Sequence, residues 1–172
     1  MNTLFNLIEG NFEGKKDKGE TLDLGDLRKE CLDEVIYKLD IEKKKLEQMG
    51  PFQQYGPYSL TEKMRWRGRD KGVYIIRYQT GRCMVVGESG CLSNRRTRYS
   101  TVYKKGGKGI VHASSTSDCQ AARKMYNYDD SGLDAFDYSY IYIPNESLRK
   151  VVEERLIQIL KPLCNTEHMA GK

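Results

Sequence analysis

Two side chains in one basic segment could act together on a phosphate. Arg95 and Tyr99 lie four residues apart in a stretch that is predicted to be helical, so they occupy neighbouring positions one turn apart. Leu92 marks the inward face of this helix, and Arg95 lies close to that face. An arginine beside a buried stripe needs a partner, either a bound phosphate or a salt bridge at the core edge. The residues alone leave both readings open.

A carboxylate near the end of the chain is the second candidate. Glu153 precedes Leu156 and Leu160 by three and seven residues, which places it at the margin of the apolar stripe of a predicted helix. Glu154 is turned about 100° further, toward solvent. A carboxylate at a core margin is costly unless it binds a cation or hydrogen-bond donors. Glu153 is therefore the candidate metal ligand, and an ordinary solvated glutamate is the alternative.

The element that must position these residues is a hairpin over residues 72–87. The first strand, Gly72-Val-Tyr-Ile-Ile-Arg-Tyr78, has apolar residues on both faces, which is typical of a strand covered on both sides. Thr80-Gly81 supplies the turn, and Cys83-Met-Val-Val-Gly87 returns as the second strand. Tyr74 lies in the first strand and Gly87 ends the second.

Further elements flank this hairpin. Residues 135–143 alternate like a strand, with four aromatic side chains on one face, and Asn145 can cap a helix over residues 146–161. A short helix near 118–126 interrupts an otherwise polar stretch over 101–130. The pattern predicts an α+β fold with a small, mainly antiparallel three-stranded sheet flanked by helices. We expect residues 1–70 to form an N-terminal helical extension and basic loop, and residues 71–172 to form the domain that carries the candidate catalytic residues.

The added N-terminal helix is predicted over residues 25–49, with Asp26 as N-cap and Gly50-Pro51 as its end. Its apolar stripe runs through Leu27, Cys31, Val35 and Leu39. The stripe could pack on the rest of the protein, form a dimer contact, or carry a DNA-facing arm.

These motifs together resemble the GIY-YIG endonucleases. The G-V-Y and V-V-G strands are followed by L-x-x-R-x-x-x-Y. The restriction-enzyme branch is similar in having His or Tyr four residues after the arginine, the position that Tyr99 fills. The run Glu153-Glu-Arg-Leu-Ile157, then Pro162 and Asn165, resembles the repair nucleases. The resemblance covers residues 72–100 and 135–165. One departure is Val85, which replaces the second family tyrosine, and the possible stand-ins are Tyr78, Arg82 and Tyr99.

The resemblance implies a metal-dependent endonuclease that hydrolyses phosphodiester bonds. Tyr74 is then the general base or its relay, although a tyrosine of ordinary pKa, about 10, needs a nearby cation or arginine to act so. Arg95 neutralises the scissile phosphate, Tyr99 orients the water or the phosphate, and Glu153 holds Mg²⁺ or Mn²⁺. Gly87 and Asn165 support the site.

The biological role implied is a sequence-specific, restriction-type enzyme that cuts double-stranded DNA as a homodimer. One alternative is a non-catalytic DNA-binding protein of the same fold, because a family tyrosine is lost at Val85. The other is a structure-specific DNA repair nuclease.

Charge and composition agree with a nucleic-acid partner. The formal net charge is +5, and the sequence pI is about 8.9. Five scattered cysteines form no C-x-x-C pair, so we expect neither a zinc site nor a disulfide framework. Without a signal peptide or a membrane-length apolar run, a cytoplasmic location is expected. The candidate DNA-binding residues are basic: Arg65, Arg67, Arg69, Arg82, Arg96, Arg98, Lys104, Lys105 and Lys108.

Overall fold

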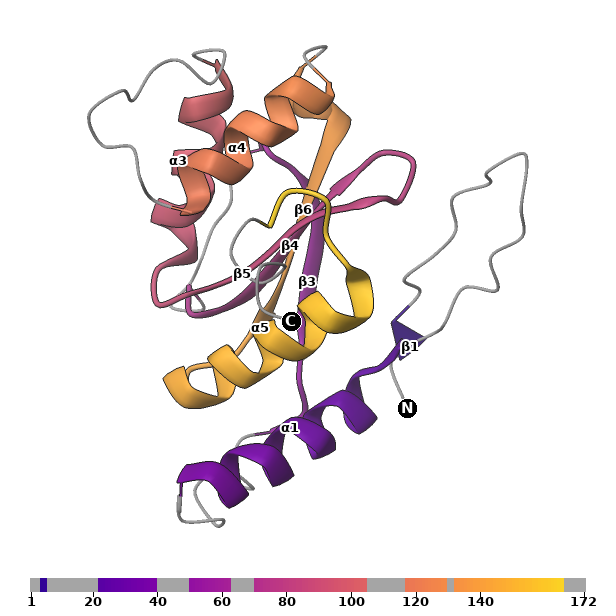
Figure 1. The fold of residues 1–172 in the computed structure, drawn as a ribbon, viewed down its shortest axis with the longest axis vertical. Coiled ribbons are helices and arrows are strands. Elements are labelled where there is room, and N and C mark those ends of the chain that lie inside the picture. Colours follow the sequence, from indigo (N-terminus) through magenta and orange to yellow (C-terminus); the bar gives the residue numbers. More distant parts are fainter. Residues whose placement is uncertain are drawn as a thin grey trace, which may run out of the picture.

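A four-stranded antiparallel sheet organises the protein (Figure 1). The computed structural model describes residues 4–5, 22–39, 50–62, 70–104, 117–129 and 132–165. The strand order in the sheet is β3 (Gln54–Ser59), β6 (Phe136–Tyr142), β4 (Gly72–Tyr78) and β5 (Cys83–Ser89). A separate two-stranded pairing joins β1 (Leu4–Phe5) to β2 (Leu22–Asp23).

Among the described residues, four helices flank the sheet in two layers. Helices α1 (Leu24–Leu39) and α5 (Glu146–Leu160) pack together on one face, and α3 (Leu92–Lys104) and α4 (Ser117–Tyr128) pack together on the other (Figure 1). A single 3₁₀ turn, η1 (Leu133–Ala135), leads into β6. The expected α+β class is confirmed. Within the described residues, no helix has the length and apolar character needed to cross a membrane.

The β4–β5 hairpin forms as the sequence predicts. The Tyr78 amide donates to the Arg82 carbonyl at 2.9 Å, and Gly81 adopts a positive φ of 86° in the turn between them. Both faces of β4 are buried. Val73 and Ile75 belong to the core shared with α1 and α5, whereas Tyr74 and Ile76 belong to the core beneath α3 and α4. Two separate apolar cores therefore meet at this strand.

The predicted three-stranded sheet is wrong by one strand. Residues 54–59, expected to lie in an irregular region, pair with β6 as the edge strand β3. Gly56 and Pro57 are both poor strand formers, which hides the strand in the sequence. The structure accommodates them because the register shifts between Tyr55 and Tyr58 and because an edge strand tolerates a missing amide donor.

The N-terminal helix packs on its own chain. Leu27, Cys31 and Val35 are buried in the same core as residues of α5, and Arg155 of α5 forms an ion pair with Glu30 at 2.8 Å. This confirms the core-packing reading for the described part of the stripe. The rest of the predicted helix, residues 40–49, lies outside the described residues.

Two more predictions are confirmed, for the helix α5 and the strand β6, and one is refined, for residues 101–130. Asn145 caps α5, since its side chain accepts a hydrogen bond from the Leu148 amide at 2.9 Å. The alternating aromatic face of β6 also forms, with Phe136, Tyr138 and Tyr140 in one core. The stretch predicted as mostly irregular is more helical than expected, because α3 continues to Lys104 and α4 spans twelve residues.

We predict that Leu27→Ala destabilises the protein without changing its oligomeric mass. Leu27 is 1% exposed, so truncation leaves a cavity and lowers the free energy of unfolding by about 3 kcal/mol. Lys29→Ala, on the exposed side of α1, is the control. Denaturant unfolding and sedimentation velocity measure the two effects. A lower mass with unchanged stability would instead assign this stripe to a partner subunit.

Candidate active site

A glycine on β5 makes room for the first candidate residue, Tyr74. Tyr74 on β4 lies directly opposite Gly87 on β5 in the strand register. A Cβ atom built on Gly87 would fall well inside contact distance of the Tyr74 hydroxyl and ring. The phenol therefore lies across β5 at the one position where that strand has no side chain.

The second tyrosine meets the first at its hydroxyl. Tyr74 Oη and Tyr99 Oη are 3.1 Å apart, and each residue is 2% exposed. The rings meet edge to face with centroids 5.8 Å apart, while Tyr138 stacks against Tyr74 at 5.7 Å. The structure thus brings together two residues that are 25 positions apart in the sequence.

This contact bears on Val85, which stands where the resemblance to the GIY-YIG endonucleases predicts a second tyrosine. Val85 is 2% exposed and lies in the same core as Tyr74, but it carries no hydroxyl. Of the three possible stand-ins, Tyr78 packs against Tyr128 and Phe136, and Arg82 is exposed at the hairpin turn. Tyr99 is the stand-in whose hydroxyl lies beside that of Tyr74.

The edge of β5 supplies the backbone of the site. β5 is the outermost strand, and the segment after α5 covers part of its open edge. The Cys164 amide donates to the Met84 carbonyl at 2.8 Å. Asn165 then bonds both ways with Val86: Oδ1 accepts from the amide at 3.0 Å, and Nδ2 donates to the carbonyl at 2.6 Å. Asn165 therefore holds the strand directly before Gly87.

Glu153 occupies the next place along this edge. Its carboxylate accepts a hydrogen bond from the backbone N–H of Glu88. Burial raises the pKa of Glu153 from 4.5 to about 7, the Glu88 N–H opposes that shift, and the Glu88 carboxylate adds to it. The half-buried position agrees with the predicted place at the stripe margin, and Glu154 is exposed as predicted.

Arg95 lies near both parts of the site. Its charge lowers the pKa of Glu153 and that of Tyr138, the ring stacked on Tyr74, although burial dominates both shifts and raises both pKa values. Helix α3 is fixed at its start because the Leu92 amide donates to the Asp70 carbonyl at 2.6 Å. The tyrosine pair and Glu153 therefore both adjoin Gly87–Glu88, and the charge of Arg95 reaches Glu153.

The basic DNA-binding candidates have different surroundings. Arg98 is exposed on α3, whereas Arg96 donates to the Ser59 carbonyl at 2.9 Å and to the Glu62 carbonyl. Burial lowers the pKa of Arg96. Arg96 thus braces the turn after β3, a role that the sequence does not predict. Lys104 is the last residue of α3, and five candidates lie outside the described residues: Arg65, Arg67, Arg69, Lys105 and Lys108.

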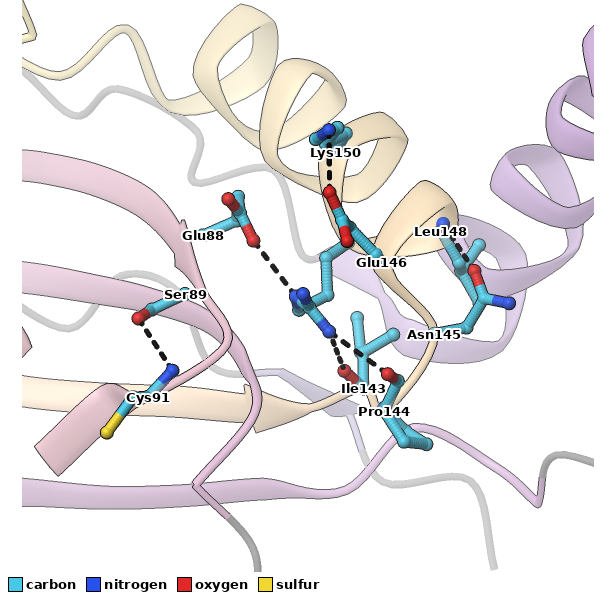
Figure 2. A network of polar contacts seen from close by, with 10 residues as sticks. Glu88, Ser89, Cys91, Ile143, Pro144, Asn145, Glu146, Leu148 and Lys150 are labelled. Atoms are coloured by element: carbon cyan, nitrogen blue, oxygen red, sulfur yellow. Dashed lines mark hydrogen bonds and ion pairs between the residues drawn. The ribbon is translucent and has the colours of Figure 1, made fainter.

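Sequence reasoning missed one charged pair beside the site. Arg149 of α5 is 5% exposed, and its Nε lies 2.9 Å from a carboxylate oxygen of Glu88 (Figure 2). Two signals could have found it. Strand alternation puts Glu88 on the same face as buried Val86, and Arg149 stands one helical turn before Glu153.

A magnesium or manganese ion fits the residues that are present. No group of three or more histidine, cysteine, aspartate or glutamate side chains gathers within the described ranges. Mg²⁺ commonly uses only one or two protein carboxylates and completes its shell with water and substrate phosphate oxygens. A single half-buried carboxylate beside an arginine matches that pattern when the substrate carries a phosphate.

Comparisons of the chain with protein-family models, with curated proteins and with solved structures find no match. The resemblance to the GIY-YIG endonucleases consequently stays a prediction, and the geometry of these side chains is what supports a function.

We predict that Gly87→Ala is far more disruptive than Gly90→Ala. A methyl group at position 87 collides with the Tyr74 phenol, so either the ring or the strand must shift, at a cost of about 1–3 kcal/mol. At position 90 the nearest atom, Arg149 Nη2, is 3.7 Å away, which is an ordinary contact. Thermal unfolding of both variants makes the comparison, and equal stabilities would contradict the placement of Tyr74.

We also predict that Glu153→Gln stabilises the protein at pH 8 but not at pH 4. Because the folded-state pKa of about 7 exceeds the unfolded value of 4.5, the folded state binds more protons between these values, and stability falls as pH rises through that window. The neutral amide avoids a penalty of about 3 kcal/mol above pH 7. Urea unfolding at both pH values measures the difference. Glu154→Gln, at an exposed neighbour, should show no such dependence.

Proposed function

We propose that the protein is a metal-dependent endonuclease that hydrolyses phosphodiester bonds in DNA. One observation carries the proposal: the tyrosine hydroxyl pair and the half-buried carboxyl of Glu153 contact adjacent residues of the edge strand β5, Gly87 and Glu88. The charge of Arg95 reaches the same carboxyl. Phosphodiester hydrolysis needs a proton acceptor for the attacking water, positive charge against the phosphate, and an oxygen ligand for a divalent cation. These four side chains supply all three.

Tyr74 and Tyr99 are assigned to the proton. Tyr74 would act as the base in its phenolate form, after losing its own proton to solvent. It would then accept the proton of the attacking water directly, or Tyr99 would take that proton and pass its own hydroxyl proton to Tyr74 Oη, 3.1 Å away. The packing of both rings in the core fixes the direction of the two hydroxyls. Arg95 binds the scissile phosphate and offsets the negative charge that develops on it.

Glu153 is assigned to the cation. Its carboxylate would hold Mg²⁺ or Mn²⁺, oriented by the hydrogen bond from the Glu88 amide. When bound, the cation neutralises charge on a phosphate oxygen. Gly87 and Asn165 act indirectly, because Gly87 admits the Tyr74 ring and Asn165 fixes the strand beside it.

The substrate proposed is double-stranded DNA, cut at specific sequences by a restriction-type enzyme in the cytoplasm. The basic net charge of +5 favours a polyanionic partner. The homodimer stays a prediction, and it would give one cut in each strand by symmetry. Its contact must lie elsewhere than the described apolar stripe of α1, which is buried against α5.

Two alternatives differ from this proposal in measurable ways. A DNA-binding protein without cleavage is favoured by Val85, which offers no hydroxyl in the core. It would shift DNA in a gel and leave a plasmid intact with Mg²⁺. A structure-specific repair nuclease would cut branched DNA in preference to linear duplex. Discrete plasmid fragments, in contrast, support the restriction-type reading.

We predict that Glu153→Gln binds DNA but no longer cleaves it, whereas Glu154→Gln cleaves nearly normally. The amide of glutamine is a poor ligand for a hard cation, and Glu154 is exposed on the same helix. Plasmid cleavage and gel-shift affinity are measured for both variants at equal salt, with and without Mg²⁺. DNA binding by the Glu153 variant can rise, because a carboxylate that repels phosphate is lost.

The reverse pattern, with only the Glu154 variant inactive, would contradict the assignment of the carboxylate. Parental cleavage by both variants would remove Glu153 from the reaction. A parent protein that binds but never cuts DNA would favour the non-catalytic alternative.

A further inference from the structure

A buried arginine holds the strand residue that contacts Glu153. Arg149 Nε lies 2.9 Å from Glu88, and its Nη1 donates to the carbonyls of Pro144 at 3.0 Å and Ile143 at 3.4 Å (Figure 2). The Arg149 side chain is 7% exposed and that of Glu88 is 24% exposed. The pair links α5 to β5 across 61 sequence positions. A charge this deeply buried requires its partner, since an unpaired buried ion is strongly destabilising.

Glu88 offers two groups with opposite effects on Glu153. Its backbone N–H donates to the Glu153 carboxylate, which orients and stabilises that group. The side chain of Glu88 is a second carboxylate. It points toward α5, where it meets Arg149, one helical turn before Glu153. Without Arg149 that second carboxylate would lose its direct ion-pair partner, since Lys150, whose charge also reaches it, is paired with Glu146. It would then compete for any divalent ion that Glu153 binds.

We propose that Arg149 is a positioning residue for the candidate cation site: it engages the Glu88 carboxylate, so that Glu153 alone binds the ion. This inference rests on the proposed function. In this arrangement the backbone N–H of Glu88 supports Glu153, whereas Arg149 keeps the Glu88 side chain away from the cation. An ion pair too distant from the cation site to affect it would leave cation affinity unchanged when either partner is lost.

The test measures Mn²⁺ affinity by electron paramagnetic resonance on the full-length protein without DNA, beside Mg²⁺-dependent plasmid cleavage. Arg149→Met releases Glu88, so Mn²⁺ should bind about threefold or more tightly while cleavage slows about tenfold. Glu88→Gln leaves the arginine charge uncompensated, so Mn²⁺ should bind about threefold or more weakly. The double variant, Glu88→Gln with Arg149→Met, should return to within about twofold of the parent, since no charge remains at either position.

The matched control is on the same helix. Lys150 pairs with Glu146 at 2.9 Å, with side chains 58% and 67% exposed (Figure 2), and the charge of Glu88 reaches Lys150 more weakly than this pairing does. Lys150→Met removes an exposed cation next in sequence to Arg149 and should change Mn²⁺ affinity by less than about twofold, because water screens its effect on Glu88. If Arg149→Met does not fold, Glu88→Gln decides the question, because it is nearly isosteric and predicts weaker Mn²⁺ binding.

Equal or weaker Mn²⁺ binding by a folded Arg149→Met would overturn the inference, and so would unchanged binding by Glu88→Gln. Either result, with a parent that binds Mn²⁺ and cuts DNA, leaves the proposed function intact. A parent that neither binds Mn²⁺ nor cuts DNA overturns the proposed function, and the inference with it.

Discussion

The missing side chain at Gly87 is the constraint on which the rest of the candidate site depends. Any Cβ there would occupy the space of the Tyr74 phenol, which crosses β5 to meet Tyr99. The hydroxyl pair therefore exists because one strand position is empty. The residues on either side of Gly87 in β5 hold the other parts of the site. Val86 bonds to Asn165 before the glycine, and Glu88 donates to Glu153 after it. A short run of backbone thus aligns residues from β4, α3 and α5.

The position of β5 at the edge of the sheet explains how this run can bind side chains. An interior strand uses its N–H and C=O groups on both sides, whereas an edge strand leaves one row unpaired. In this protein Asn165 takes both groups of Val86, and Glu153 takes the amide of Glu88. The groups that would otherwise invite pairing with another chain instead fix the site residues. This also explains why α5 must be held firmly to β5, which the buried Arg149–Glu88 pair does.

Local patterns in the sequence predicted what depends on local physics. The β4–β5 hairpin, the Asn145 cap and the marginal position of Glu153 each follow from turn, capping or helical spacing rules. The strand β3 was missed because Gly56 and Pro57 oppose a strand locally, and only its pairing with β6 stabilises it. The pairing of Arg149 was missed, and Arg96 was predicted to bind DNA, for a related reason. Their partners are 61 and 37 residues away, and although spacing rules show which face a residue occupies, they do not show which distant residue it meets.

In the proposed nuclease, the raised pKa of Glu153 would reconcile an acidic site with an anionic substrate. A carboxyl whose pKa is about 7 is half protonated at neutral pH, so the resting site carries less negative charge than its two glutamates suggest. Arg149 offsets the charge of the other glutamate. In the proposed nuclease, DNA would therefore meet Arg95 beside a nearly neutral strand edge. At neutral pH, full ionisation of Glu153 would then need a bound cation, because an added positive charge offsets the cost of burying the carboxylate. In the proposed nuclease, binding of the cation would therefore ionise Glu153, and the cation would in turn attract the phosphate, whereas a solvated glutamate would be ionised without it.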